Sequence, residues 1–153
     1  MALVVSGLLI GGRIIGDMLE RDLAVRTISA TNAKIFGVIA DYLYGEVLAK
    51  STIDRLDIVH KLEVIETYIS ELPTETSTNT TDKSTLVSLN GIHQICERIH
   101  EELANIKTKL EDHKQKYFYY MRSVDISMDL VRVEQHMTNL DNRFQMFLAI
   151  RKH

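Results

Sequence analysis

Hydrophobic residues recur at alternating steps of four and three between Ile92 and Tyr117, and they predict a long amphipathic helix over about 84–120. Side chains at this spacing lie on the one face of an α-helix that packs against partner helices. Charged side chains occupy the positions between them, as on a solvated face. We name these residues the hydrophobic seam: Ile92, Cys96, Ile99, Leu103, Ile106, Leu110, His113 and Tyr117.

The closing stretch repeats this spacing from Ile126 to Phe147 and predicts a last helix over about 125–150. The two patterns are out of phase between Tyr117 and Ile126, which favours a turn at 121–125. One continuous bent helix remains the alternative, because neither glycine nor proline marks that stretch.

The first half of the chain predicts two helices, over 3–28 and 33–72, with a turn at Thr27–Thr31, where the residues are small and polar. Pro73 ends the second helix, and residues 73–84 have no hydrophobic anchor, so they predict a flexible polar loop. A capping-box pattern at Ser51–Asp54 leaves open a break near 50–52. The predicted buried face of 33–72 consists of Phe36, Ile39, Leu43, Val47, Ile58, Leu62, Ile65, Ile69 and Leu72.

Together these elements predict an all-α fold in one domain, residues 1–153. We expect an antiparallel four-helix bundle, or five helices if 33–72 is broken, with long third and fourth helices. The lengths match in pairs, 33–72 with 84–120 and 3–28 with 125–150, as such a bundle requires.

Composition supports an ordinary globular protein, with 45% hydrophobic and 25% charged residues. The net charge of −3 argues against general nucleic-acid binding, which needs a concentrated basic field. Cys96, the one cysteine, cannot form an internal disulfide, and its place in the hydrophobic seam predicts a buried thiol. We expect a cytoplasmic protein that associates with a membrane when active, because the apolar run at 2–12 lacks the basic residues and the cleavage site of a signal peptide.

The sequence contains few features of a catalytic or metal-binding site. Glu97 and His100 have the spacing of a bundle metal motif, and Asp57 and His60 echo it. The further carboxylates that a di-metal site needs fall mostly on polar faces. We therefore expect no enzyme, no metal or other cofactor and no small-molecule substrate.

The first helix begins with an unusual apolar stretch that contains four glycines, Gly7, Gly11, Gly12 and Gly16. Each glycine costs a soluble helix about 1 kcal/mol relative to alanine, so their number needs a reason. Close approach to a neighbouring helix in the core is one reason, and packing within lipid is the other. The residues predicted to insert into a membrane are Leu3, Val4, Val5, Gly7, Leu8, Leu9, Ile10, Gly11 and Gly12.

Lysines and aromatic residues lie close together near the end of the third predicted helix. Such a cluster suits a helix that rests on an anionic lipid surface, with cations at the headgroups and rings at the interface. The alternative is a solvated face balanced by nearby carboxylates. The predicted lipid-contacting residues are Lys107, Lys109, Lys114, Lys116 and Tyr119.

The layout resembles the HeLo/MLKL-like cell-death domains of membrane-permeabilising executioners and some immune receptors. The resemblance lies in the glycine-spaced apolar start at 3–12, the polar loop, the Ile99–Leu103 stretch and the closing helix around Val133–Asp141. It implies a dormant bundle that oligomerises and disrupts a membrane with its first helix, through residues 7–12 in particular. The basic patch of such domains is sparse here.

Two functions follow as hypotheses, and both expect a homo-oligomer. The first is a membrane-active bundle of the regulated cell-death type, which permeabilises an anionic membrane through its first helix. The alternative is a non-enzymatic adaptor, scaffold or capsid component that assembles through its heptad seams.

Overall fold

A computed structural model of the chain describes residues 13–72, 83–115 and 124–151, with side chains from residue 21 onward. These residues form helices and connections without a strand, so the predicted all-α class is confirmed. The elements are α2 (Arg13–Asp41), the 3₁₀ turn η2 (Leu43–Gly45), α3 (Val47–Arg55), α4 (Ile58–Ser70), α5 (Lys83–Gln115) and α6 (Ser127–Arg151).

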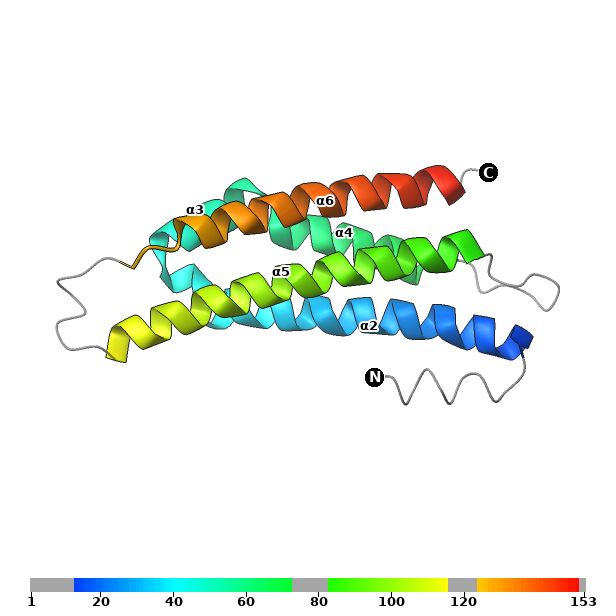
Figure 1. Cartoon of the computed structure of the whole chain (residues 1–153), viewed down its shortest axis with the longest axis horizontal. Helices are drawn as coiled ribbons and strands as arrows, with labels where there is room; N and C mark the ends of the chain where they lie inside the picture. The colour runs from blue at the N-terminus through cyan, green and yellow to red at the C-terminus, as the bar shows by residue number, and fades with distance from the viewer. Residues whose placement is uncertain (1–12, 73–82, 116–123, 152–153) are drawn as a thin grey trace.

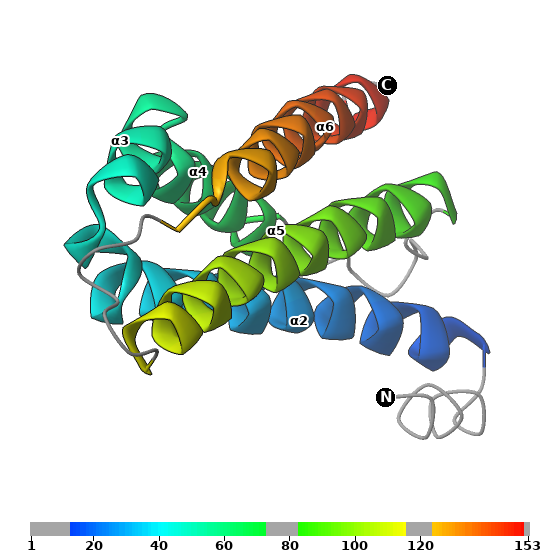
Figure 2. The same cartoon turned by 60° about the vertical axis from the view of Figure 1, so that its left-hand side comes forward.

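The long helices form an elongated bundle in which successive arms run in opposite directions (Figure 1). Helices α2 and α5 run one way along the long axis, and α4 and α6 run the other. Helix α5 packs against both α2 and α6, while α2 also packs against α4. The turned view shows the same arrangement, with α5 between α2 and α6 (Figure 2). The contacts between the long helices are therefore centred on α5.

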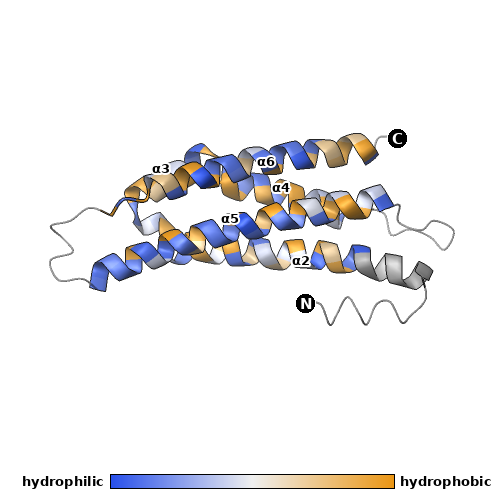
Figure 3. Ribbon diagram, viewed as in Figure 1, coloured by the Kyte–Doolittle hydropathy of each residue, from blue (hydrophilic) through white to orange (hydrophobic). Residues whose placement is uncertain are grey.

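The core consists largely of the faces that the spacing predicts, and the hydrophobic positions that recur along α5 (Figure 3) are mostly buried. Six residues of the hydrophobic seam, from Ile92 to Leu110, are buried, and His113 is half-buried. Tyr117 lies outside the described residues. On α6 the buried set runs from Leu130 to Phe147, so the two heptad patterns did identify inward faces.

The turn predicted at Thr27–Thr31 is wrong, because α2 continues through it without a break. The Thr27 hydroxyl donates to the carbonyl oxygens of Leu23 at 3.0 Å and Ala24 at 2.9 Å. A hydroxyl that bonds back to the preceding turn no longer competes for the backbone. Ile28 is fully buried in the same stretch, so packing holds the helix together there.

The predicted helix over 33–72 is divided, but at 42–46 and 56–57 rather than near 50–52. Glu46 is extended and caps α3, with its carboxylate accepting from the Ala49 N–H at 2.7 Å. Asp57 precedes α4 in the left-handed conformation, with φ of 54°. The first break also re-phases the chain, so that Val47, expected to be buried, is 83% exposed.

A polar contact crosses the core between α2 and α4. The Glu66 carboxylate accepts from Ser29 Oγ at 3.1 Å and from Asn32 Nδ2 at 3.2 Å. Asn32 is fully buried, so sliding one helix along the other would leave a buried amide without this partner. The contact therefore specifies the register of α2 against α4.

The turn predicted before α6 is confirmed where it is described, whereas the predicted loop at 73–84 ends earlier than expected. Residues 73–82 of the predicted loop lie outside the described residues, and Lys83 and Ser84 already belong to α5. Residues 124–126 are not helical, so the alternative of one continuous helix through this stretch is wrong. The Asp125 carboxylate accepts from the Ser127 N–H at 3.0 Å and thereby caps the start of α6.

Candidate functional site

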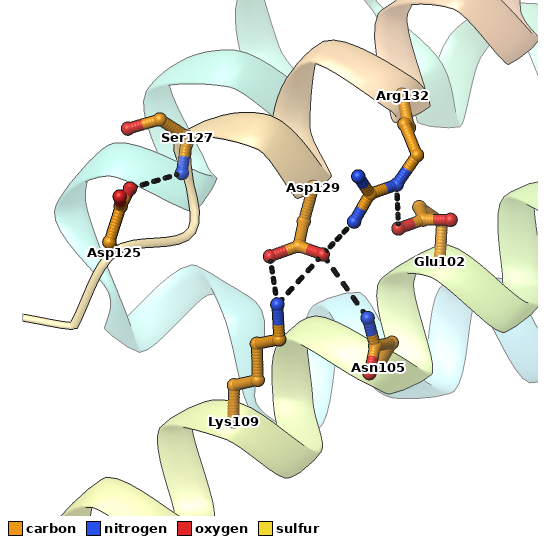
Figure 4. A network of polar contacts seen from close by, with 7 residues as sticks. All are labelled: Glu102, Asn105, Lys109, Asp125, Ser127, Asp129 and Arg132. Atoms are coloured by element: carbon orange, nitrogen blue, oxygen red, sulfur yellow. Dashed lines mark hydrogen bonds and ion pairs between the residues drawn. The ribbon is translucent and has the colours of Figure 1, made fainter.

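A buried carboxylate, Asp129, is the centre of a charge network between α5 and α6 (Figure 4). Its side chain is only 1% exposed. Lys109 Nζ lies 2.8 Å from Oδ2 and 3.2 Å from Oδ1 of Asp129. Asn105 Nδ2 donates to Oδ1 at 3.1 Å, and Arg132 Nη2 donates to the same oxygen. Arg132 Nε also donates to Glu102 Oε1 at 2.8 Å. Glu102, Asn105, Lys109, Asp129 and Arg132 are the network from here on.

Helical spacing brings these side chains together. Glu102, Asn105 and Lys109 are three and four residues apart and therefore share one flank of α5. Asp129 and Arg132 are likewise neighbours on α6. Asp129 also lies in the first turn of α6, where the helix dipole favours a negative charge.

The network is suited to fastening two helices and poorly suited to catalysis. Its two acids and two bases cancel in charge, and the Asp129 carboxylate is surrounded by three donor side chains. The hydrogen bond and charge of Glu102 raise the pKa of the Arg132 guanidinium above its ordinary value. A carboxylate held in this way is neither a free base nor an available metal ligand, and removing one partner would leave a buried charge uncompensated.

Three of the four lysines predicted to contact lipid form contacts within the molecule, at two different places. Lys109 belongs to the network, whereas Lys107 Nζ and Lys114 Nζ lie over the Tyr42 ring, 5.9 Å and 5.1 Å from its centroid. Tyr42 follows the end of α2, so these lysines join α5 to the first break in the chain. Lys116 and Tyr119 lie outside the described residues.

The predicted insertion residues Leu3, Val4, Val5, Gly7, Leu8, Leu9, Ile10, Gly11 and Gly12 also lie outside the described residues. Among the helices that are described, none combines the length and the apolar character needed to cross a membrane.

The residue pairs considered for metal binding, Glu97 with His100 and Asp57 with His60, do not belong to a cluster of metal ligands among the described residues. Glu97 Oε1 pairs with His93 Nε2 at 2.9 Å, on the same helix as His100. Within residues 13–72, 83–115 and 124–151, no three potential ligands gather to hold a metal ion. Cys96 is buried as predicted, and this burial raises the pKa of its thiol to about 12.

The outer face of α6 is the feature that the sequence interpretation missed. The most exposed residues of this helix are uncharged, whereas those of α5 include Arg98 and Glu101. The charged side chains of Arg132, Glu134 and Asp141 are 41%, 45% and 47% exposed, and each forms an ion pair within the chain. We name the following residues the neutral stripe: Met128, Val131, Gln135, Thr138, Asn139, Asn142, Gln145, Met146 and Ala149. A second three-four spacing runs through these residues, and that spacing is the signal by which the sequence could have revealed them.

Ion pairs and hydrogen bonds hold charged side chains of α6 along the two flanks of the helix. On one flank, Arg132 bonds to the network and Arg143 donates to the carbonyl oxygen of Gly91. On the other flank, Glu134 pairs with Arg55 of α3 at 3.0 Å, and Asp141 pairs with Lys61 of α4 at 3.3 Å. These contacts leave the neutral stripe between the two flanks.

The chain is similar to a viral protein. The chain is 28% identical over 85 residues to an uncharacterised protein of Acanthamoeba polyphaga mimivirus. The match covers 56% of this chain and 41% of that protein, so it spans about two fifths of the relative's length. No protein family and no solved structure matches the chain.

Proposed function

We propose that this chain is a non-enzymatic helical assembly module, which works by binding protein through the outer face of α6. The observation that carries the proposal is the neutral stripe. A solvated helix face is ordinarily rich in charged residues, and an exposed face without them is suited to burial against another surface. Val131 is 42% exposed, and Met128 and Met146 are 62% and 65% exposed.

The heptad seams themselves are not the assembly surface in this proposal. The seam residues from Ile92 to Leu110 are buried within the bundle, so a partner could reach them only by opening the fold. Binding at the neutral stripe leaves the bundle closed. The assembly role expected from the sequence is therefore retained, but it is assigned to the outer face of α6 instead of the heptad seams.

Sedimentation velocity over a range of protein concentrations tests this proposal. We expect reversible association of the full chain, and Val131→Glu should abolish it by placing a charge within the neutral stripe. Val87→Glu is the matched control, because Val87 is also an exposed valine, 62% exposed, but lies on α5. Association that resists Val131→Glu, or a wild-type chain that stays monomeric and binds no other protein, would contradict the proposal.

Membrane permeabilisation is a second proposal, supported by the apolar, glycine-rich sequence of residues 2–12. Its lipid-contacting lysines receive less support, because Lys107, Lys109 and Lys114 are engaged within the molecule. Dye leakage from anionic liposomes tests this function, with neutral liposomes for comparison. Leakage that Leu9→Glu abolishes would favour it, and no leakage by a folded, helical chain would exclude it for this domain.

A further inference from the structure

We infer that the neutral stripe is a two-fold interface, on which α6 of one copy packs antiparallel against α6 of a second copy. This inference rests on the proposed assembly function and adds the partner, the direction and the register. It is drawn from the order of residues along the stripe. A two-fold interface is formed by the same patch on both subunits, so residue i meets residue j and residue j meets residue i.

The neutral stripe has this symmetry in its own sequence. Its ends are apolar, with Met128 and Val131 at one end and Met146 and Ala149 at the other. Between the ends lie side chains with amide or hydroxyl groups. An antiparallel partner with its axis between positions 138 and 139 would place Met128 against Ala149, Val131 against Met146, Gln135 against Asn142 and Thr138 against Asn139.

This register places residues of similar chemistry opposite one another in four pairs, and the remaining stripe residue, Gln145, falls opposite Arg132, whose guanidinium is bonded to Glu102 and Asp129 within its own chain. Apolar side chains bury apolar surface at both ends of the helix pair. Gln135 and Asn142 each carry a donor and an acceptor, so an amide can satisfy an amide across the axis. Polar residues at such positions specify register and partner in helix pairs. A parallel arrangement would instead place each residue near its own copy and lose the pairing of unlike side chains.

The geometry of the stripe also fits one helix. Its residues fall within an arc of about 120°, at about 100° per residue. From Met128 to Ala149 the stripe is about 32 Å long, at 1.5 Å per residue. One pair of helix faces is a small contact, below the roughly 1,200 Å² at which stable specific interfaces begin, so we expect a reversible dimer.

A second copy of the chain fits this face better than a lipid membrane or a nucleic acid would. A lipid surface would have to desolvate the central amides of Gln135 and Asn142 without replacing their hydrogen bonds. Nucleic acid would find no cation in the stripe. The second copy supplies amides opposite amides and no unpaired charge.

Cysteine cross-linking of the full chain tests direction and register. Thr138→Cys lies at the axis and should form a disulfide-linked dimer on mild oxidation. Met128→Cys and Ala149→Cys should not link to themselves, because the two ends of the stripe are about 32 Å apart. A mixture of these two variants should link. Gln94→Cys, exposed on α5, is the control, and the wild type with its buried Cys96 should give no dimer.

Charge reversal gives an independent readout by sedimentation velocity. Gln135→Glu with Asn142→Glu places like charges opposite one another and should dissociate the dimer. Gln135→Lys with Asn142→Glu places opposite charges across the axis and should restore it. All these sites are exposed on the helix, and circular dichroism should confirm folding of each variant.

The outcomes separate this inference from the function on which it rests. Self-linking of Met128→Cys, no linking of Thr138→Cys, or failure of the Lys/Glu variant to associate would overturn the antiparallel dimer. If association still depended on Val131, the assembly function would stand with another geometry. A wild-type chain that never associates and binds no other protein would overturn both.

Discussion

Lys109 Nζ lies 2.8 Å from Oδ2 of Asp129, and this contact joins the C-terminal half of α5 to the first turn of α6. The lysine is 45% exposed and the aspartate 1% exposed, so a buried carboxylate is neutralised from the solvent side. The contact secures the start of α6, which is the helix that carries the neutral stripe.

Removing the buried charge should destabilise the bundle. We expect Asp129→Asn to lower the free energy of unfolding by about 1–3 kcal/mol, because the charge-assisted bonds from Lys109 and Arg132 are lost. Urea unfolding followed by circular dichroism measures the change. Asp54→Asn is the control, since Asp54 forms an exposed ion pair with Lys50 at 2.9 Å and should change stability far less. Equal effects at both sites would refute the structural role of the network.

The hydrophobic seam should be sensitive to loss of volume. Ile99 is fully buried, and we expect Ile99→Ala to lower the free energy of unfolding by about 2–5 kcal/mol through lost burial and a residual cavity. Val87 on the same helix is 62% exposed, so Val87→Ala should cost less than about 0.5 kcal/mol. Chemical denaturation of both variants checks the contrast. Similar losses would mean that α5 does not bury this face.

Cys96 should be unreactive in the folded protein. Burial raises the pKa of its thiol to about 12, so the nucleophilic thiolate is scarcely populated at neutral pH. A chromogenic thiol reagent should label no cysteine in buffer and one cysteine per chain in denaturant. Rapid labelling of the native protein would show that α5 does not enclose the thiol.

The same shift in pKa predicts a loss of stability in base. The unfolded thiol begins to ionise near pH 8.5, whereas the folded thiol stays protonated until about pH 12. Between these values the unfolded state binds fewer protons than the folded state, so stability falls as the pH rises. Thermal unfolding of wild type and Cys96→Ala should converge through this range.

The left-handed residue before α4 offers a stabilising change. Asp57 has φ of 54°, which glycine adopts without the steric cost of a Cβ atom. We expect Asp57→Gly to raise the free energy of unfolding by up to about 1 kcal/mol. Ser51→Gly, inside α3, should instead lower it by about 0.5 kcal/mol. Calorimetry of the two variants would show opposite shifts, and a destabilised Asp57→Gly would contradict this backbone conformation.

The long helices were predictable because their hydrophobic spacing is sustained over many turns. Neither the continuity of α2 nor the breaks that follow it before α3 and α4 could be predicted in the same way. Thr27 was interpreted by its turn preference, but its hydroxyl bonds to the preceding turn of the helix. The breaks at 42–46 and 56–57 depend on an extended Glu46 and a left-handed Asp57, and neither conformation has a strong sequence signature.

The candidate site was hidden for a different reason. Lys109 is an ordinary surface lysine in the sequence, and Asp129 an ordinary acid in the first turn of a helix. Their relationship depends on which flank of α5 faces α6, and spacing within one helix does not define that flank. The neutral stripe could have been found, because its three-four spacing is local to α6.

The flanking ion pairs of α6 have a consequence for how the molecule responds to salt. Screening weakens contacts between charges, over a Debye length of about 8 Å at physiological ionic strength. Glu134 and Asp141 already meet their cations within the same chain, and the stripe between them carries no charge. Added salt should therefore loosen the bundle slightly while leaving the affinity of one copy for another almost unchanged. Ionic strength would then change the stability of the folded chain while the affinity between two copies stayed almost the same.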